Sequence, residues 1–261
     1  MKKIWLSSPH MGGIEHEFVQ EAFDGNWIAP IGPNLNEFER ELSNFTGAKY
    51  SVGLTSGTAA IHLALILLDV KKDDVVICSS FTFSASVNPI IYQKAKPVFV
   101  DSETETWNMD PLLLEKAIKE CIKKGKKPKA IILVHLYGYP AKLNEIMEIS
   151  NRYYIPIIED AAEAVGSKYN DQPLGTFGEL GIFSFNGNKI ITTNTLKKSC
   201  IVDAAKALLN SPSLLTWPKE TRVFVTVVPI FAPMTIGIAY SRLRTPLPTN
   251  PTIVDVVTDE D

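Results

Sequence analysis

Short apolar runs alternate with longer segments of helical period between about residues 46 and 189. The runs are apolar throughout, which is typical of strands buried on both faces of a mainly parallel sheet. They predict strands at 75–78, 97–101, 130–134, 155–160 and 181–185. The segments between them predict helices, among them 61–68, 111–118 and 143–153. The expected fold is therefore α/β, a doubly wound sheet with helices on both faces and a ligand at the carboxyl ends of its strands.

The two ends of the chain depart from this alternation. The first 45 residues predict an arm with helices at 14–23 and 36–45 around a Pro- and Gly-rich connection. Prolines recur in the last fifty or so residues, and only 223–228 in that part looks like a strand. Three regions are expected: an N-terminal arm with helices (1–45), a domain built on the sheet (46–193) and a tail of unassigned fold (194–261).

Composition narrows the class of protein. The chain has 261 residues, 45% of them hydrophobic, which is enough for one or two domains with a real core. A net charge of −3 argues against nucleic acid or an anionic membrane as a partner, and no apolar stretch is long enough to span a bilayer. Three cysteines without paired spacing and the absence of a signal-peptide pattern favour a reducing, cytoplasmic location and no zinc cluster. The Lys-rich stretch 119–129 is expected to be a solvated helix end and loop.

Two local patterns suggest places for an anion and for a cation. Small and hydroxyl-bearing residues at 55–60, with Gly57 and Thr58 among them, lead into an apolar helix. The free N–H groups of such a helix start can bind phosphate, although the pattern also fits an ordinary N-cap. Asp160 ends a buried strand, where its carboxylate could neutralise a protonated ring nitrogen. A helix cap or a surface acid remains the alternative for Asp160.

Two further patterns suggest a nucleophile and an aromatic surface. Lys189 lies in a polar turn just beyond the strand at 181–185, where desolvation can turn an amine into a nucleophile. Solvent exposure is the alternative for Lys189. The segment 80–83 carries two phenylalanines that could face a flat ring, with core packing as the alternative. A phosphate site, an aromatic face, a carboxylate and a nucleophilic lysine together describe a pyridoxal phosphate (PLP) site.

Other site types find less support. The four histidines show no metal-ligand spacing, and no Gly-x-Gly-x-x-Gly motif follows a strand, which argues against a dinucleotide-binding dehydrogenase.

Several stretches resemble one known family. They are SGTAAIHLAL, SSFTFSASVNPIIYQKAKPVFVDSE, ILVHLYGYPAKL, IIEDAAEAVGSKY, LGTFGELGIFSFNGNKIITT and the arm PHMGG…NWIAPIGP. Together they cover residues 1 to about 193 and resemble the DegT/StrS family of PLP-dependent sugar aminotransferases. That resemblance implies the aspartate-aminotransferase (type I) fold, PLP as cofactor, a nucleotide-linked keto sugar as substrate, an amino-acid donor such as glutamate, and a homodimer.

The resemblance also implies roles for individual residues. Lys189 would bind PLP covalently and then shuttle the proton during transamination, and Asp160 would pair with the pyridine nitrogen. The other cofactor contacts are implied for Gly57, Thr58 and Ser184 at the phosphate, Phe83 on the ring and Glu163 near the ring hydroxyl. His135 is expected to be structural or to contact site residues only.

The resemblance also implies a class of substrate, but it does not include the tail. The arm around Trp27 and the string that ends at Lys189 are most similar to enzymes that aminate UDP-linked 4-keto-6-deoxy-N-acetylhexosamines, for surface polysaccharide or glycan biosynthesis. Lys189 also differs from the family's dehydratase branch, which lacks this lysine. After Thr193 nothing resembles the family, which suggests a truncated or frame-shifted sequence. The homodimer of the family could then be lost in this chain. A cofactor- or sugar-nucleotide-binding remnant without turnover is therefore the alternative function.

Overall fold

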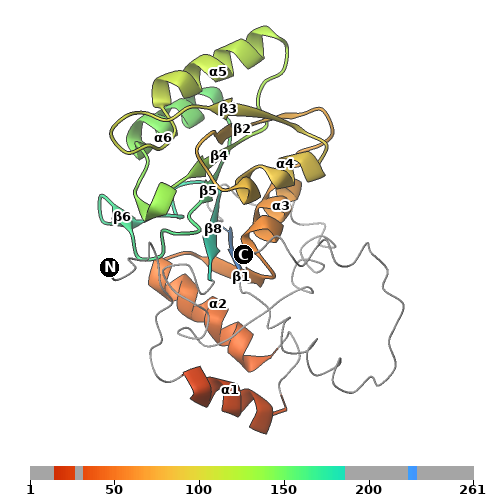
Figure 1. The fold of residues 1–261 in the computed structure, drawn as a ribbon, viewed down its shortest axis with the longest axis vertical. Helices are drawn as coiled ribbons and strands as arrows, with labels where there is room; N and C mark the ends of the chain where they lie inside the picture. The colour runs from red at the N-terminus through yellow and green to blue at the C-terminus, as the bar shows by residue number, and fades with distance from the viewer. Residues whose placement is uncertain (1–14, 27–31, 186–222, 228–261) are drawn as a thin grey trace, which may run out of the picture. The chain divides into compact units, whose positions relative to one another are not determined.

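A parallel sheet forms the centre of the part of the chain that the computed structural model describes, residues 15–26, 32–185 and 223–227. All of these belong to the compact unit Met1–Pro229, and a second unit, Ile230–Asp261, lies outside the described residues. The sheet has seven strands in the order β1-β9-β8-β5-β4-β2-β3, and every pair is parallel (Figure 1). The strands are β1 (Tyr50–Leu54), β2 (Val75–Ser79), β3 (Lys96–Val100), β4 (Ala130–Val134), β5 (Ile157–Asp160), β8 (Leu180–Ser184) and β9 (Val223–Val227).

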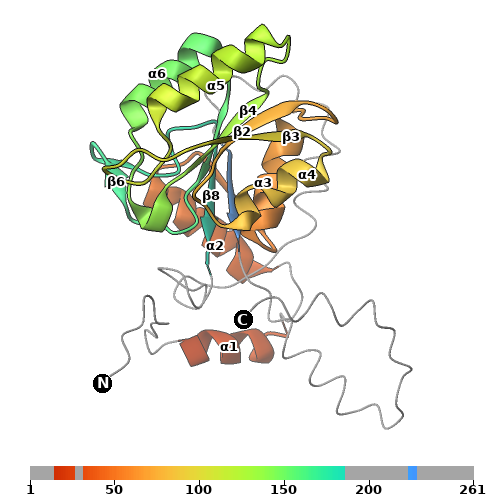
Figure 2. The ribbon, with the colours of Figure 1, turned by 45° about the horizontal axis from the view of Figure 1, so that its top comes forward.

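Helices cover both faces of this sheet. The helices of the described residues are α1 (Glu15–Asp24), α2 (Pro33–Thr46), α3 (Gly57–Leu67), α4 (Asn88–Tyr92), α5 (Pro111–Lys123) and α6 (Leu143–Tyr153), with the short 3-10 helices η1 (Ser84–Ser86) and η2 (Leu136–Gly138). Figure 2 shows α5 and α6 on one side of the sheet and α3 and α4 on the other. A small hairpin, β6 (Lys168–Tyr169) with β7 (Gln172–Pro173), precedes β8. In the described part of the chain no helix is both long and apolar enough to cross a membrane.

The predicted fold class is confirmed, and most predicted elements lie within a few residues of their positions. Strand β4 coincides with the predicted 130–134, and the helix predicted at 143–153 is α6. The segment 223–228 is indeed a strand, but β9 lies inside the sheet between β1 and β8. The pattern analysis did not predict β1 or α4, because Ser51 and Gly53 interrupt the apolar run of β1 and α4 has only five residues. The boundaries expected after residues 45 and 193 stay predictions.

Alternate residues of the central strands β2, β4, β5 and β8 belong to two separate cores. Ile158 of β5 packs with Ile182 of β8 in the core beneath α3 and α4. Ile157, its neighbour in β5, packs with Phe183 in the core beneath α5 and α6. Side chains alternate between the faces of a strand, so each new residue along β5 changes core.

A buried glutamate stabilises the end of β5 on the α5–α6 side. Glu159 is fully buried and accepts hydrogen bonds from the N–H groups of Gly175 (2.8 Å), Phe177 (2.6 Å) and Gly178 (2.5 Å). Its fourth partner is Nε2 of the buried His135, at 2.9 Å. Nδ1 of His135 accepts from the Ala141 N–H, so Nε2 carries the hydrogen and donates it to Glu159. His135 therefore has the structural role that the sequence suggested.

A second buried carboxylate shapes the loop between β3 and α5. Burial raises the pKa of Glu103, but hydrogen bonds from the Thr106 hydroxyl and from the N–H groups of Glu105 and Thr106, with Lys142 nearby, bring it down to about 2. The loop continues to the buried Asn108, whose side chain bonds the Leu136 N–H and the Tyr139 carbonyl. Glu103 and Asn108 thus fix this loop against the one after β4.

We expect Glu159→Gln to destabilise the chain by about 2 to 4 kcal/mol, because one amide oxygen cannot serve four donors and its NH₂ would face N–H groups. Urea unfolding measures the loss. The matched control is Glu179→Gln, an exposed carboxylate close to the same loop, which should stay within about 0.5 kcal/mol of the parent chain. Equal effects of the two substitutions would contradict the structural role of Glu159.

Glu103 should make stability depend on acid. Its pKa in the folded chain is lower than the 4.5 of an unperturbed glutamate, so its contribution is complete above pH 4.5 and is lost as the pH falls toward 2. Chemical unfolding at several pH values should show the parent chain and Glu103→Gln converging in that window. Glu105→Gln, an exposed partner of the same Lys142, serves as control and should keep the parent's pH dependence.

Candidate functional site

The predicted site residues that the structure describes gather at one edge of the sheet. Gly57 and Thr58 begin α3 just after β1, Asp160 ends β5 and Ser184 ends β8. Strands β1, β5 and β8 run parallel in one sheet, so their carboxyl ends share an edge. This is the edge where ligands bind in open α/β sheets.

The same residues also share one face of the sheet. Asp160 follows Ile158 by two residues and Ser184 follows Ile182 by two, and both isoleucines pack beneath α3. The two-residue period of a strand therefore directs Asp160 and Ser184 toward the α3 side. Glu159, which the sequence pairs with Asp160 as neighbouring acids, faces the opposite core and belongs to the structural clamp described above.

The start of α3 offers unused hydrogen-bond donors. The side chain of Ser56 caps the helix by accepting from the Ala59 N–H at 3.1 Å, and the Ser56 carbonyl accepts from the Ala60 N–H at 2.9 Å. Within the described residues the N–H groups of Gly57 and Thr58 have no hydrogen-bond partner. The N-cap and the anion site that the sequence left as alternatives are thus compatible, because different N–H groups serve each.

Asp160 is a buried acid whose carboxylate lies at the carboxyl edge. It is 7% exposed, and the residues after it form turns rather than a helix, so both alternatives for it, a surface acid and a helix cap, are wrong. Its Oδ2 accepts from the Ser86 hydroxyl at 2.6 Å and its Oδ1 from the Ala162 N–H at 3.3 Å. Burial, with the negative charge of Asp160 nearby, raises the pKa of the Cys78 thiol to about 12. Cys78 therefore remains a neutral neighbour of this carboxylate.

The two phenylalanines after β2 lie at the surface. Phe83 is 75% exposed and Phe81 is 49% exposed, so the alternative of core packing is wrong for both. Phe81 makes an edge-to-face contact with the exposed Trp107, with ring centroids 6.3 Å apart. Phe83 is the N-cap residue of η1, whose last residue, Ser86, contacts Asp160. An aromatic ring and the buried carboxylate are thus connected through three residues of backbone.

Two other predicted residues are less constrained by what the structure describes. Glu163 is half-buried in the turn after β5, and its carbonyl oxygen lies 2.4 Å from where a Cβ on Gly138 would be. Gly138, at φ +78°, therefore has both a steric and a conformational reason to be glycine. Lys189 lies outside the described residues, as does the arm around Trp27, so their roles stay predictions.

Sequence analysis missed Ser86, which is fully buried, and its partner Thr82, whose Oγ1 lies 2.6 Å from the Ser86 oxygen. The only signal in the sequence is a hydroxyl-rich segment, SSFTFSAS. Spacing alone does not show which of its hydroxyl groups reaches Asp160 at the end of β5.

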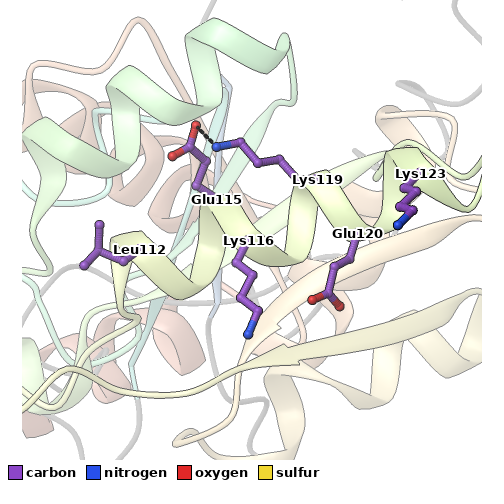
Figure 3. Close-up of a pocket in the computed structure, with 6 residues that line it drawn as sticks. All are labelled: Leu112, Glu115, Lys116, Lys119, Glu120 and Lys123. Carbon is purple, nitrogen blue, oxygen red and sulfur yellow. Dashed lines mark ion pairs between the residues drawn. The ribbon is translucent and has the colours of Figure 1, made fainter.

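The hollow in Figure 3 lies away from these residues, along one face of α5. All of its lining residues come from α5, and Lys119 forms an ion pair with Glu115 at 3.1 Å. Its lysines are side chains of an exposed helix surface, which confirms the prediction of a solvated helix end there. Among the described residues no cluster of His, Cys, Asp and Glu could hold a metal ion.

Comparison with known proteins identifies the family of the chain. The model of the DegT/DnrJ/EryC1/StrS aminotransferase family matches residues 9–195. The chain is 56% identical over 193 residues to a putative PLP-dependent aminotransferase, EpsN, of Bacillus subtilis, covering 74% of this chain and 50% of that protein. It is 42% identical over 193 residues to the GDP-perosamine synthase of Escherichia coli O157:H7, covering 74% of this chain and 51% of that protein.

Solved structures give the same result. A putative sugar aminotransferase from Streptococcus pneumoniae, Spr1654, in its PLP form, superposes with a TM-score of 0.67 and 30% identity, over 85% of this chain and 62% of that one. The chain thus spans about half the length of the curated relatives it matches. With a family model that matches most of its length and a sheet edge of the corresponding fold, the chain belongs to the DegT/DnrJ/EryC1/StrS aminotransferase family.

Proposed function

We propose that this chain binds PLP and contributes to the transamination of a nucleotide-linked keto sugar, with glutamate as the amino donor. The observation that carries the proposal is one arrangement: the N–H groups that begin α3, which no described residue accepts from, and the buried carboxylate of Asp160 lie at one edge and on one face of the sheet. Family membership supports the reaction class.

The described residues fit the cofactor. PLP carries a phosphate, and the N-terminus of α3 offers free donors and the positive end of a helix dipole. PLP also carries a ring nitrogen that functions when protonated, and a buried carboxylate next to a neutral thiol is suited to hold that proton. Exposed Phe83 is available to the flat ring.

Each residue then has a task. The N–H groups of Gly57 and Thr58, with the Ser184 hydroxyl, would bind the phosphate, and Asp160 would keep the proton on the ring nitrogen. Phe83 would shield one face of the ring from water and Glu163 would lie near the ring hydroxyl.

Lys189 would hold the cofactor covalently until the amino group of glutamate replaces it. Its Nζ, then free, would move the proton taken from the α-carbon of glutamate. When bound, PLP supplies a conjugated ring that accepts the electrons left by that proton.

The finer part of the proposal concerns the sugar and the setting. The arm around Trp27 and the string ending at Lys189 favour a UDP-linked 4-keto-6-deoxy-N-acetylhexosamine, within surface polysaccharide or glycan biosynthesis. Cys78 and Cys121 are buried free thiols, which supports a cytoplasmic setting. We also propose that the chain forms a homodimer and that it is organised in the three regions 1–45, 46–193 and 194–261.

The first experiment asks whether Lys189 binds the cofactor. The purified chain mixed with PLP should show a visible absorbance band, and borohydride followed by peptide mass analysis should place the reduced adduct on Lys189. Lys189→Ala should lose both signals, whereas Lys168→Ala, an exposed lysine, should retain them. An adduct spread equally over surface lysines, or one unchanged in Lys189→Ala, would refute the proposal.

The second experiment separates turnover from binding. Glutamate should bleach the band if the chain transaminates, and a persistent band would favour the binding remnant. The amino form is then offered UDP-linked and GDP-linked 4-keto-6-deoxy sugars under the same conditions. We expect the UDP-linked N-acetylhexosamine to restore the band at least about tenfold faster, since a site that hydrogen-bonds one substrate group rejects analogues without it. A faster reaction with the GDP-linked sugar would overturn the choice of nucleotide.

A further inference from the structure

A chain of two hydroxyl groups reaches the Asp160 carboxylate from the turn after β2. Thr82 Oγ1 and Ser86 Oγ are 2.6 Å apart, and Ser86 Oγ is 2.6 Å from Asp160 Oδ2. Ser86 is fully buried, whereas Thr82 is partly exposed. The two hydroxyl groups therefore connect a partly exposed position with Asp160, the acid of β5 that faces the α3 side.

When Asp160 is ionised, the two hydroxyl protons of Thr82 and Ser86 can point in only one direction, toward the carboxylate. A carboxylate only accepts, so Ser86 must donate its single hydroxyl proton to Oδ2. The Ser86 oxygen is then an acceptor, and Thr82 must donate to it. Thr82 thereby orients the Ser86 hydroxyl, and each of the two short bonds strengthens the other.

The Ser86 hydroxyl gives the buried Asp160 carboxylate a short hydrogen bond, at 2.6 Å. The carboxylate is buried, and its neighbour Cys78 is a neutral thiol rather than a cation. The Ala162 N–H reaches Oδ1 at the longer distance of 3.3 Å. A buried carboxylate without good donors is costly, and a hydrogen bond to a charged group contributes more than one between neutral groups.

The segment that supplies the hydroxyls also carries the aromatic ring. Phe83 lies between Thr82 and Ser86, and its carbonyl accepts from the Ser86 N–H at 3.0 Å. Holding Ser86 on Asp160 therefore also fixes where the backbone of Phe83 lies relative to that carboxylate. One short turn couples Phe83, which the proposed function assigns to a face of the cofactor ring, with Asp160, which it assigns to the ring nitrogen.

We propose that Ser86, oriented by Thr82, is a positioning residue for Asp160. It holds the carboxylate in the orientation at which the cofactor's ring nitrogen binds, and it fixes Phe83 against that carboxylate. This inference rests on the proposed function for its consequence, but the Ser86–Asp160 interaction itself exists without any cofactor. The two can therefore be tested separately.

The first test needs no cofactor. Urea unfolding of the full chain is compared for Ser86→Ala, Asp160→Ala, the double variant and the parent chain. If the hydroxyl supports the carboxylate, the effects of the single substitutions on the unfolding constant should depart from additivity by at least about threefold. Additive effects would overturn the proposal.

The second test measures PLP binding, by the visible band and by titration. Thr82→Val keeps the shape of the side chain and removes the donor, and Ser86→Ala removes the central hydroxyl; both should weaken PLP binding about tenfold and shift the band. Thr82→Ser and Ser86→Thr keep the hydroxyl and should restore binding, which a merely structural role would not require. Ser84→Ala, an exposed hydroxyl in the same turn, is the matched control and should bind as the parent does.

The outcomes distinguish the two proposals. If the parent chain binds no PLP, the proposed function fails, and the unfolding cycle alone decides whether Ser86 supports Asp160. If the parent binds PLP and both Ser86→Ala and Thr82→Val bind it equally well with an unchanged band, the positioning role is refuted. Loss of binding with rescue by the hydroxyl-bearing variants supports it.

Discussion

Two neighbouring carboxylates end the central strand β5, and the pleat of the strand sends them to opposite faces of the sheet. Burying both is possible only because each side provides its own donors. On the α5–α6 side Glu159 accepts three backbone N–H groups and the His135 ring. On the α3 side Asp160 receives the Ser86 hydroxyl. The candidate site depends on this division, because Glu159 fixes the turn on one face while Asp160 lies on the α3 face, where the proposed function places the cofactor.

The frame that Glu159 fixes extends directly to the site. Its backbone partners, Gly175, Phe177 and Gly178, form the turn that leads into β8, and β8 ends at Ser184. A carboxylate in one core thus helps to set the position of a hydroxyl at the edge of the other face. Glu159 thus acts on the candidate site through the backbone, although its side chain faces the other core.

Long-range pairing determines where the start of α3 lies. Strand β1, which leads into α3, reaches the rest of the sheet through β9, a segment about 170 residues further along the chain. The packing of α3 over Ile158 and Ile182 holds it from the other direction. Strand pairing between segments so distant cannot be read from local pattern, and the sequence accordingly indicated a strand near 223 without indicating its neighbours.

The sequence by itself determined the fold class, most helices and strands, and the candidates Gly57, Thr58 and Asp160, because apolar periodicity and strand ends are local properties. Ser184 was a candidate only through the family resemblance. The sequence singled out Asp160 but did not show the role of Glu159, since only the register of β5 against two cores shows which acid faces which side. Nor could it find Ser86, because its contact with Asp160, 74 positions away in the sequence, joins the turn after β2 to β5, two strands away in the sheet. The residue types in the sequence indicated the chemistry, and the tertiary structure decided which of these residues come into contact.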